Sequence, residues 1–278
     1  VRMPEMGLGE VLPVITREFP KLIVIATSGD TDFDKSLTIL DGGAHDFLEK
    51  PLNLDILEIA LSWVAHRQPL LELAASGFSG SDGLVSGDAI AARLDALSAA
   101  IAANGGPFQE HLRHVRRVAS LARALKDAFP LEDWRDLELA ALLHEMGSSH
   151  IMQSLIAQPR RLEQAELHVV HSHAQISSRL TMGYLGRQDV ATAIGHHHAW
   201  ERLTAPGAPA CARELRLAIW LGLLNYVDGC LRDRADRMPY STAEVHESLK
   251  GRFAASKLEP IRQLLEHWGA IEQVYQAP

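Results

Sequence analysis

From residue 88 to its end, the chain keeps the hydrophobic period of amphipathic helices almost without interruption. Prolines and glycines break this period at intervals typical of helix–helix connections. The helices expected between the breaks cover residues 88–103, 107–128, 131–147, 162–182, 187–200, 213–232, 241–252 and 257–275. No repeat of fixed length is present. The pattern predicts an all-helical bundle over residues 88–278 and a mainly α fold for the chain.

The first 68 residues follow a different pattern, in which short apolar runs alternate with helical ones. "KLIVIATSGD" (21–30) and "HDFLEKP" (45–51) predict buried strands. A helix ended by two glycines is expected between them, and an amphipathic helix capped by Asn53 after them. This β–α–β–α order predicts part of a parallel sheet. A stretch rich in Gly and Ser at 75–88 predicts a linker, placed at 69–87 between the segment 1–68 and the helical domain.

Composition narrows the classes of function. A net charge of −8 argues against broad binding to DNA, because phosphate contacts need a basic face. Two cysteines are too few for a disulfide framework, and no apolar run approaches the ~18 residues of a membrane span. Because no signal peptide pattern opens the sequence either, we expect a cytoplasmic protein.

Histidine is the unusual residue, with 14 copies. Any one of them, taken alone, is more often a core or surface residue of a helix than a metal ligand. Five segments of the helical part nevertheless carry His or His with an acid. They contain Glu110 and His114; His144 and Glu145; His168, His171 and His173; His196, His197 and His198; and Asp228 in an otherwise apolar helix. Imidazole and carboxylate ligands of this kind suit Fe, Mn or Zn in a two-metal site, without choosing the reaction.

The order of these segments resembles the HD superfamily of metal-dependent phosphohydrolases, over residues 107–265. Within it, the HD-GYP branch, which hydrolyses cyclic di-GMP, is the most similar. The resemblance implies two divalent metal ions, most often Fe or Mn and possibly Zn. It implies as ligands His114, His144, Glu145, His173, His197, His198 and Asp228, with Glu110 as an extra candidate. It also implies catalytic roles for Glu145 and Arg117, and it leaves out His168, His171 and His196.

Several positions depart from the family pattern. Glu145 stands where the family has Asp, Ser148 where it has a Lys that assists phosphate chemistry, and Ala199 where it has Glu. The Gly-Tyr-Pro that names the branch falls on 205–207, which read Ala-Pro-Gly. A carboxylate displaced by an angstrom can cost ~100-fold in rate. A lost charged donor can cost ~100–1,000-fold.

Three hypotheses therefore stand side by side. The first is a phosphodiesterase for cyclic di-GMP with reduced activity. The second is a non-catalytic module that binds metal, nucleotide or a protein partner, which could be a second copy of the chain. The third is an HD hydrolase of another nucleotide or phosphate ester.

Three short motifs in the first segment resemble the second half of a two-component receiver domain. They are "RMPE" (2–5), "ATS" (26–28) and "EKP" (49–51). The resemblance gives Thr27 and Lys50 the family's phosphoryl-binding positions, and makes the chain an output protein of two-component signalling. The acidic pair and the phosphoacceptor would lie upstream of Val1, so we expect no phosphorylation within this segment. Its open sheet edge leaves three alternatives. The segment is partly disordered, it packs on the helical domain or on a second copy, or the chain starts upstream of Val1.

Overall fold

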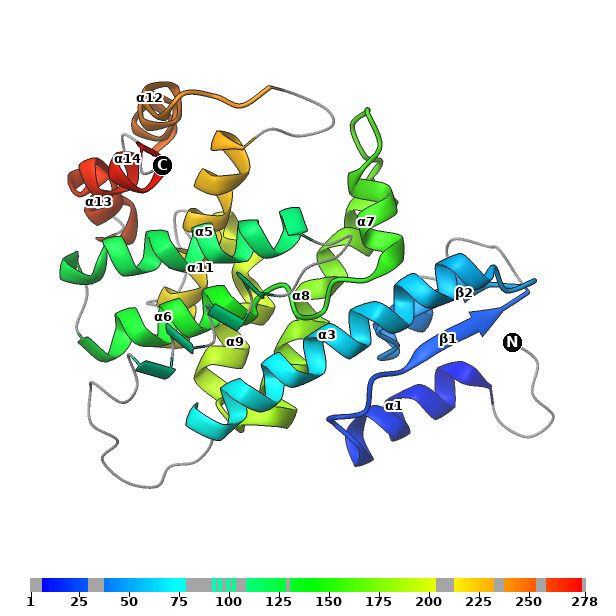
Figure 1. The fold of residues 1–278 in the computed structure, drawn as a ribbon. Coiled ribbons are helices and arrows are strands. Elements are labelled where there is room, and N and C mark those ends of the chain that lie inside the picture. The colour runs from blue at the N-terminus through cyan, green and yellow to red at the C-terminus, as the bar shows by residue number, and fades with distance from the viewer. Residues whose placement is uncertain are drawn as a thin grey trace.

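The computed structural model describes residues 7–29, 38–78, 92–93, 95–96, 99–100, 102–103, 109–128, 131–203, 213–232, 238–253 and 259–276. Within these residues the chain is mainly helical, with one two-stranded parallel sheet near its N-terminal end (Figure 1). The predicted fold class is therefore confirmed. None of the described helices has both the length and the apolar run needed to span a bilayer.

Five helices form the centre of the bundle. They are α5 (Gln109–Ala124), α6 (Leu131–Leu143), α8 (Gln164–Leu185), α9 (Gln188–His196) and α11 (Arg213–Leu231). Helix α9 packs against both α8 and α11, and α5 packs against α6. Helix α11 is apolar on all sides and carries an unbroken buried run from Leu217 to Leu224, which explains its central place.

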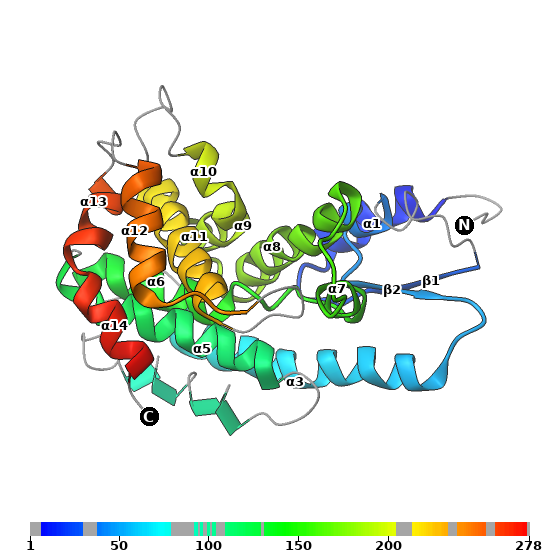
Figure 2. The ribbon, with the colours of Figure 1, turned by 90° about the horizontal axis from the view of Figure 1, so that it is seen from above.

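Shorter elements connect and flank these helices. They are η1 (Lys126–Ala128), α7 (His150–Ile156), η2 (His197–Ala199), α10 (Trp200–Leu203), α12 (Thr242–Phe253), α13 (Glu259–Glu266) and α14 (Trp268–Gln276). Helices α12, α13 and α14 lie at the end of the molecule opposite the sheet (Figures 1 and 2). Helix α14 packs back on α5.

The N-terminal segment consists of α1 (Leu8–Glu18), β1 (Ile25–Ser28) and β2 (Asp46–Glu49), followed by the long helix α3 (Leu54–Phe78). The two strands are parallel, as predicted. Thr27 lies on β1 and Lys50 follows β2, where its amide donates to the carbonyl of Ser28 at 2.7 Å. Thr27 and Lys50, the two positions that resemble phosphoryl-binding ones, therefore lie near the C-terminal ends of neighbouring strands.

Two local predictions about this segment hold. Asn53 Oδ1 accepts the backbone amide of Asp55 at 2.9 Å, which caps α3. The helix expected before the second strand lies partly outside the described residues, but its end is present and stops at Gly42 and Gly43. Gly43 has φ of 118°, a conformation that glycine adopts without the steric cost paid by other residues.

Helix α3 is longer than the sequence indicated. It continues through Pro69 to Phe78, so residues 69–78 of the expected linker are helical, and 79–87 lie outside the described residues. The reason is tertiary, because Leu70, Leu71 and Ala74 are buried in the core. Figure 2 shows α3 leading from the sheet along the bundle. The domain boundaries themselves remain predictions.

One hydrophobic core joins both parts of the chain. Leu12 of α1, Ala26 of β1 and Phe47 of β2 belong to the same buried cluster as the bundle helices. The sheet therefore packs on the helical domain, which is one of the arrangements expected from the sequence.

Candidate metal centre

The predicted histidine ligands converge from four parts of the bundle. His114 lies on α5, His144 directly after α6, His173 in α8, and His197 and His198 on η2. Together with Glu145 they form two groups, and within each group the ligand atoms lie within 4.8 Å of one another. One group is His114, His144 and Glu145, called here the first group. The other is His173, His197 and His198, called here the second group.

Backbone carbonyls fix the tautomers of three of these rings. His144, His173 and His197 each direct Nδ1 at the carbonyl three residues earlier, at 2.7, 2.5 and 2.6 Å. Since a carbonyl only accepts, each Nδ1 must carry the proton and each Nε2 a lone pair. A histidine held through Nδ1 in this way presents Nε2 as a metal ligand.

A carboxylate does the same for His114. Its Nδ1 lies 2.6 Å from Asp228 Oδ2, so Nδ1–H donates and Nε2 faces the first group. The Nε2 atoms of His114 and His144 are 3.3 Å apart. Two lone pairs that face each other at this distance require a cation, either a metal ion or a proton. Two nitrogen ligands ~2.0–2.1 Å from one tetrahedral ion would lie ~3.3–3.4 Å apart, so the spacing fits a shared metal.

The second group shows the same fit. The Nε2 atoms of His173 and His198 are 3.3 Å apart. The Nε2 of His197 is buried without a hydrogen-bond partner, which is rare for a polar atom in a protein interior. Burial and the neighbouring His173 lower the pKa of His197 to about 3. Burial likewise holds the pKa of His144 and of His198 well below the usual value. These rings are therefore neutral at physiological pH, which is the state that binds metals.

The carboxylate of Glu145, a member of the first group, also faces the second group. Its Oε1 is 3.8 Å from His114 Nε2 and 3.7 Å from His144 Nε2 in the first group. The same oxygen is 3.4 Å from His173 Nε2 in the second. The other oxygen, Oε2, accepts the hydroxyl of Ser148 at 2.5 Å. A carboxylate in this place can bridge two ions, and its side chain is 10% exposed, so the site is not sealed from solvent.

Sequence reasoning missed two histidines at the site. His111 is three residues before His114 on α5 and lies on the same helix face, which is the signal that could have revealed it. Its Nε2 is 3.6 Å from Glu145 Oε2, and burial lowers its pKa to about 4. His171, which the resemblance left out, stacks on His198 with ring centroids 4.1 Å apart.

Three predicted site residues lie behind the metal groups. The carboxylate of Asp228 is fully buried and also accepts Arg117 Nε at 2.7 Å and Tyr275 Oη at 2.6 Å. Glu110 pairs with Arg117 at 3.1 Å, and its side chain is 55% exposed. Asp228, Arg117 and Glu110 belong to neither group.

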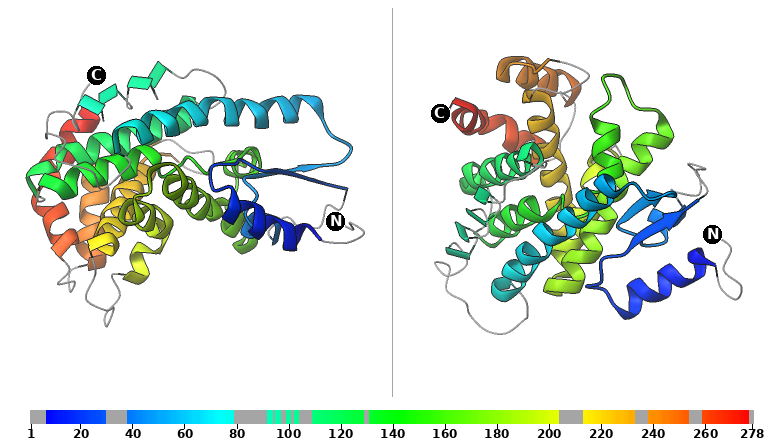
Figure 3. Two further views of the ribbon diagram at one scale, coloured as in Figure 1. Left: turned by 90° about the horizontal axis from the view of Figure 1, so that it is seen from below. Right: turned by 45° about the vertical axis from the view of Figure 1, so that its right-hand side comes forward.

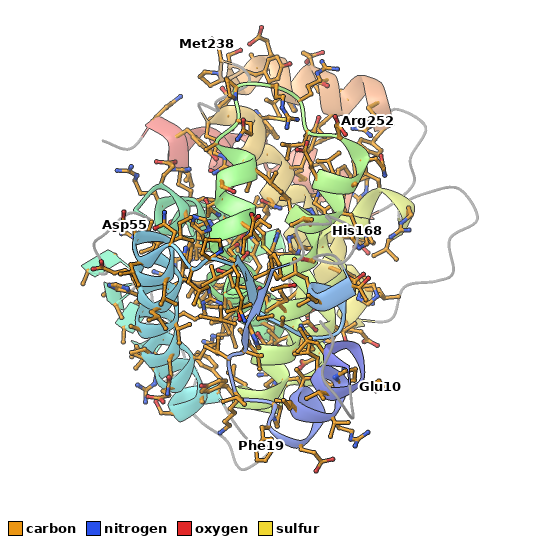
Figure 4. The ribbon with its side chains drawn as sticks, turned by 90° about the vertical axis from the view of Figure 1, so that its right-hand side faces the viewer. Glu10, Phe19, Asp55, His168, Met238 and Arg252 are labelled. Carbon is orange, nitrogen blue, oxygen red and sulfur yellow. The ribbon has the colours of Figure 1, made fainter. Side chains whose placement is uncertain are left out.

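The remaining predicted positions are more distant. His168, labelled in Figure 4, lies on the surface of α8 with its side chain 59% exposed. His196 is exposed, with its Nδ1 on the carbonyl of Thr192. Ala199 closes η2. Residues 205–207, where the Gly-Tyr-Pro would fall, lie outside the described residues.

Two glycines allow the ligand-bearing segments to approach closely. A Cβ on Gly222 of α11 would lie 2.4 Å from the carbonyl oxygen of His197. A Cβ on Gly147 would lie 2.4 Å from the carbonyl oxygen of His173. No side chain fits at either place, so both glycines keep a histidine backbone within reach of the site.

The match to a known family covers this cluster. Residues 112–236 match the model of the HD domain. The matched region covers less than half of the chain. It contains both metal groups and Asp228, whereas Glu110, His111 and the N-terminal segment lie outside the matched residues.

Three curated relatives share distant similarity with this chain. A cyclic di-GMP phosphodiesterase of Thermotoga maritima is 22% identical over 86% of this chain and 68% of its own length. The cyclic di-GMP phosphodiesterase response regulator RpfG of Xanthomonas campestris is 26% identical over 69% of this chain and 52% of its own. A 3'3'-cGAMP-specific phosphodiesterase of Vibrio cholerae is 26% identical over 56% of this chain and 31% of its own. The chain thus spans about two thirds of the first relative, about half of the second and under a third of the third. No solved structure is significantly similar to it.

Proposed function

We propose that the chain is a metal-dependent phosphodiesterase of two-component signalling, with cyclic di-GMP as its substrate. The observation that carries this proposal is the convergence of imidazole Nε2 atoms from two groups around the single carboxylate of Glu145. Support for the substrate comes from the relatives, of which two are cyclic di-GMP phosphodiesterases and one acts on 3'3'-cGAMP. The receiver-like N-terminal segment supports the role in signalling.

Two divalent ions, Fe or Mn and alternatively Zn, fit the side chains present. Histidines of the first and second groups would hold one ion each, and Glu145 would contact both. Such ions activate water and neutralise charge on a phosphoryl oxygen. A site with a single carboxylate among neutral rings leaves the charge of two divalent ions largely uncompensated, which favours an anionic phosphodiester.

The buried residues behind the groups position the ligands. We propose that Asp228 orients His114 through its Nδ1, and that Arg117 holds the carboxylate of Asp228 in place. Both differ from the roles implied by the family resemblance, in which Asp228 binds metal directly and Arg117 is catalytic. A carboxylate behind a ligating histidine fixes the ring and raises its basicity.

A second candidate function has a specific observation in its favour. Ser148, at the position of the family Lys, directs its hydroxyl at Glu145 and brings no positive charge to the substrate side. Arg117 is engaged by Asp228 and Glu110. A metal-stabilised module that binds a cyclic dinucleotide or a protein without turnover would have these properties.

The test combines metal analysis with an assay of turnover. Purified protein loaded with Mn or Fe is expected to hold two ions per chain and to linearise cyclic di-GMP faster than 3'3'-cGAMP. A His144→Ala variant is expected to lose both properties, whereas His196→Ala, at an exposed position outside the site, keeps them. Full metal occupancy without turnover of either nucleotide would favour the binding module. Absence of bound metal in the unmodified protein would refute both functions.

A further inference from the structure

Two buried charged residues of the N-terminal segment form hydrogen bonds to the backbone of the loop that follows Glu145. Arg67 of α3 donates from Nη2 to the carbonyl of Ser148 at 2.5 Å. Asp46 of β2 accepts the backbone amide of His150 through Oδ2 at 3.0 Å. A cation thus holds a carbonyl and an anion holds an amide, two residues apart in the same loop. The loop leads into α7, and both helix α3 and strand β2 contact α7. The two views of Figure 3 show α3 running along the bundle.

Arg67 is buried although no carboxylate among the described residues lies at hydrogen-bond distance from it, which is unusual for an arginine. It is 5% exposed, and its guanidinium carbon lies 5.4 Å from the centre of the Trp63 ring. Burial lowers its pKa to about 10, while Asp46 opposes that shift, so the side chain stays charged. Taking a guanidinium out of water costs several kcal/mol unless its new partners offset the loss. The carbonyl of Ser148, the ring and the nearby Asp46 are those partners.

These hydrogen bonds are connected through Ser148 to the carboxylate of Glu145. The same Ser148 that is held by its carbonyl donates its hydroxyl to Glu145 Oε2. One turn before Arg67 on α3, Trp63 packs edge-on against His111 with ring centroids 5.2 Å apart. His111 in turn faces Oε2 of Glu145 at 3.6 Å. Helix α3 therefore contacts both residues that border this oxygen.

We propose that Arg67 and Asp46 are positioning residues of the metal centre, which fix the loop carrying Ser148 and thereby hold Glu145 between the two histidine groups. Both lie outside the HD-domain match, so the receiver-like segment is a structural part of the site. A displacement of β2 or α3 would then change metal affinity. This inference rests on the proposed metal centre.

The experiment uses the full chain, stripped of metal and titrated with Mn²⁺. Loss of groups that orient metal ligands typically weakens metal binding ~10–100-fold, and we expect a loss of this size in Arg67→Gln and in Asp46→Asn. Arg67→Lys, which keeps the charge, should recover part of it. Arg179→Gln is the matched control, because Arg179 is a partly buried arginine of α8 that meets the same N-terminal segment near Gly43.

Two readouts separate positioning from mere stabilisation of the fold. A purely structural residue would lower the melting temperature of the metal-free and metal-loaded protein equally, whereas a positioning residue reduces the rise in melting temperature caused by Mn²⁺. If Arg67 acts through Ser148, then the effects of Arg67→Gln and Ser148→Ala on Mn²⁺ affinity must be less than additive.

The outcomes distinguish this inference from the function it rests on. If the unmodified chain binds no Mn²⁺, the proposed metal centre is wrong. If it binds Mn²⁺ and both Arg67→Gln and Asp46→Asn bind equally well, the metal centre stands and the positioning role is wrong. If Arg67→Gln does not fold, Arg67→Lys and Asp46→Asn decide the question in the same titration.

Discussion

Replacing Asp228 by Asn tests whether this residue orients a ligand or binds metal itself. The carboxylate is fully buried and accepts hydrogen bonds from three residues: His114 through Nδ1 at 2.6 Å, Arg117 through Nε at 2.7 Å and Nη2 at 3.4 Å, and Tyr275 through Oη at 2.6 Å. Asn has nearly the same shape, but one of its terminal atoms donates. Whichever way the amide turns, an NH₂ group therefore faces at least one of these donors, and the charge that balances Arg117 is lost.

The structure sets the size of the effect. Removing one partner of a buried ion pair costs ~3–5 kcal/mol. Arg117 is 27% exposed and keeps contact with water, so we expect about 2–3 kcal/mol. For a chain of this size that corresponds to a fall of about 5–10 °C in melting temperature. Metal affinity should fall ~10–100-fold, because His114 loses the acceptor that fixes its tautomer.

Thermal melting of the metal-free protein and Mn²⁺ titration measure the two effects separately. Tyr275→Phe is the control, since it removes one hydrogen bond to the same carboxylate and leaves the charge pair; it should cost ~1 kcal/mol and leave metal affinity unchanged. If Asp228→Asn binds Mn²⁺ as tightly as this control does, the orienting role is refuted. Complete loss of one ion with normal affinity for the other would instead identify Asp228 as a direct ligand.

Three further changes test the packing, the charges and the bridging acid. Gly222→Ala should destabilise the protein by ~1–3 kcal/mol, because its Cβ would meet the carbonyl of His197, whereas Gly229→Ala on the same helix meets nothing within 4 Å and should leave the melting temperature unchanged or higher. The second change concerns Asp189. Burial alone would raise the pKa of its carboxyl, but its arginine partners lower this pKa to about 2. Because this folded-state pKa is depressed, its stabilisation is complete above about pH 4 and is lost toward pH 2; denaturant titration should show Asp189→Asn about 1–2 kcal/mol less stable at pH 7 and nearly equal to the unmodified chain near pH 2. Glu145→Asp should bind Mn²⁺ at least ~10-fold more weakly although it restores the family's residue, and equal or tighter binding in the titration would contradict the arrangement described above.

Local patterns predicted most helices of the bundle, because most of them bury one face and α11 is apolar throughout. Helix α7 was not predicted, and the helix expected at 88–103 lies largely outside the described residues. The boundaries at Gly42 and at Asn53 follow from single residues whose backbone preference is strong. The end of α3 could not be predicted in this way. The Gly- and Ser-rich stretch suggested a linker from residue 69, but burial of Leu70 and Leu71 carries the helix through Pro69 and outweighs the hydrogen bond that proline cannot make.

The histidines of the metal groups were identified from the order of their segments and from the family resemblance. They lie inside α5 and α8, directly after α6 and on η2. What the order could not reveal is contact across the chain. His111 is an ordinary helix residue until Trp63 and Glu145 are placed beside it. Arg67 read as part of an amphipathic helix, and only the packing of α3 against α7 and α8 buries it completely.

The two departures from the family pattern at 145 and 148 act together in the structure. The sequence alone presents them as separate losses: an acid that is one methylene too long and a cation replaced by a hydroxyl. In the folded chain the longer side chain brings its Oε1 to 3.4 Å from the second group while its Oε2 meets Ser148. A side chain as large as Lys at 148 would have to occupy a position that is 1% exposed, next to the guanidinium of Arg67. A Lys ammonium held close to this guanidinium would be repelled by it, and Ser148 avoids that repulsion. The loop itself lacks the positive charge of the family Lys, whereas Arg67 of the N-terminal segment carries one and bonds the backbone of this loop.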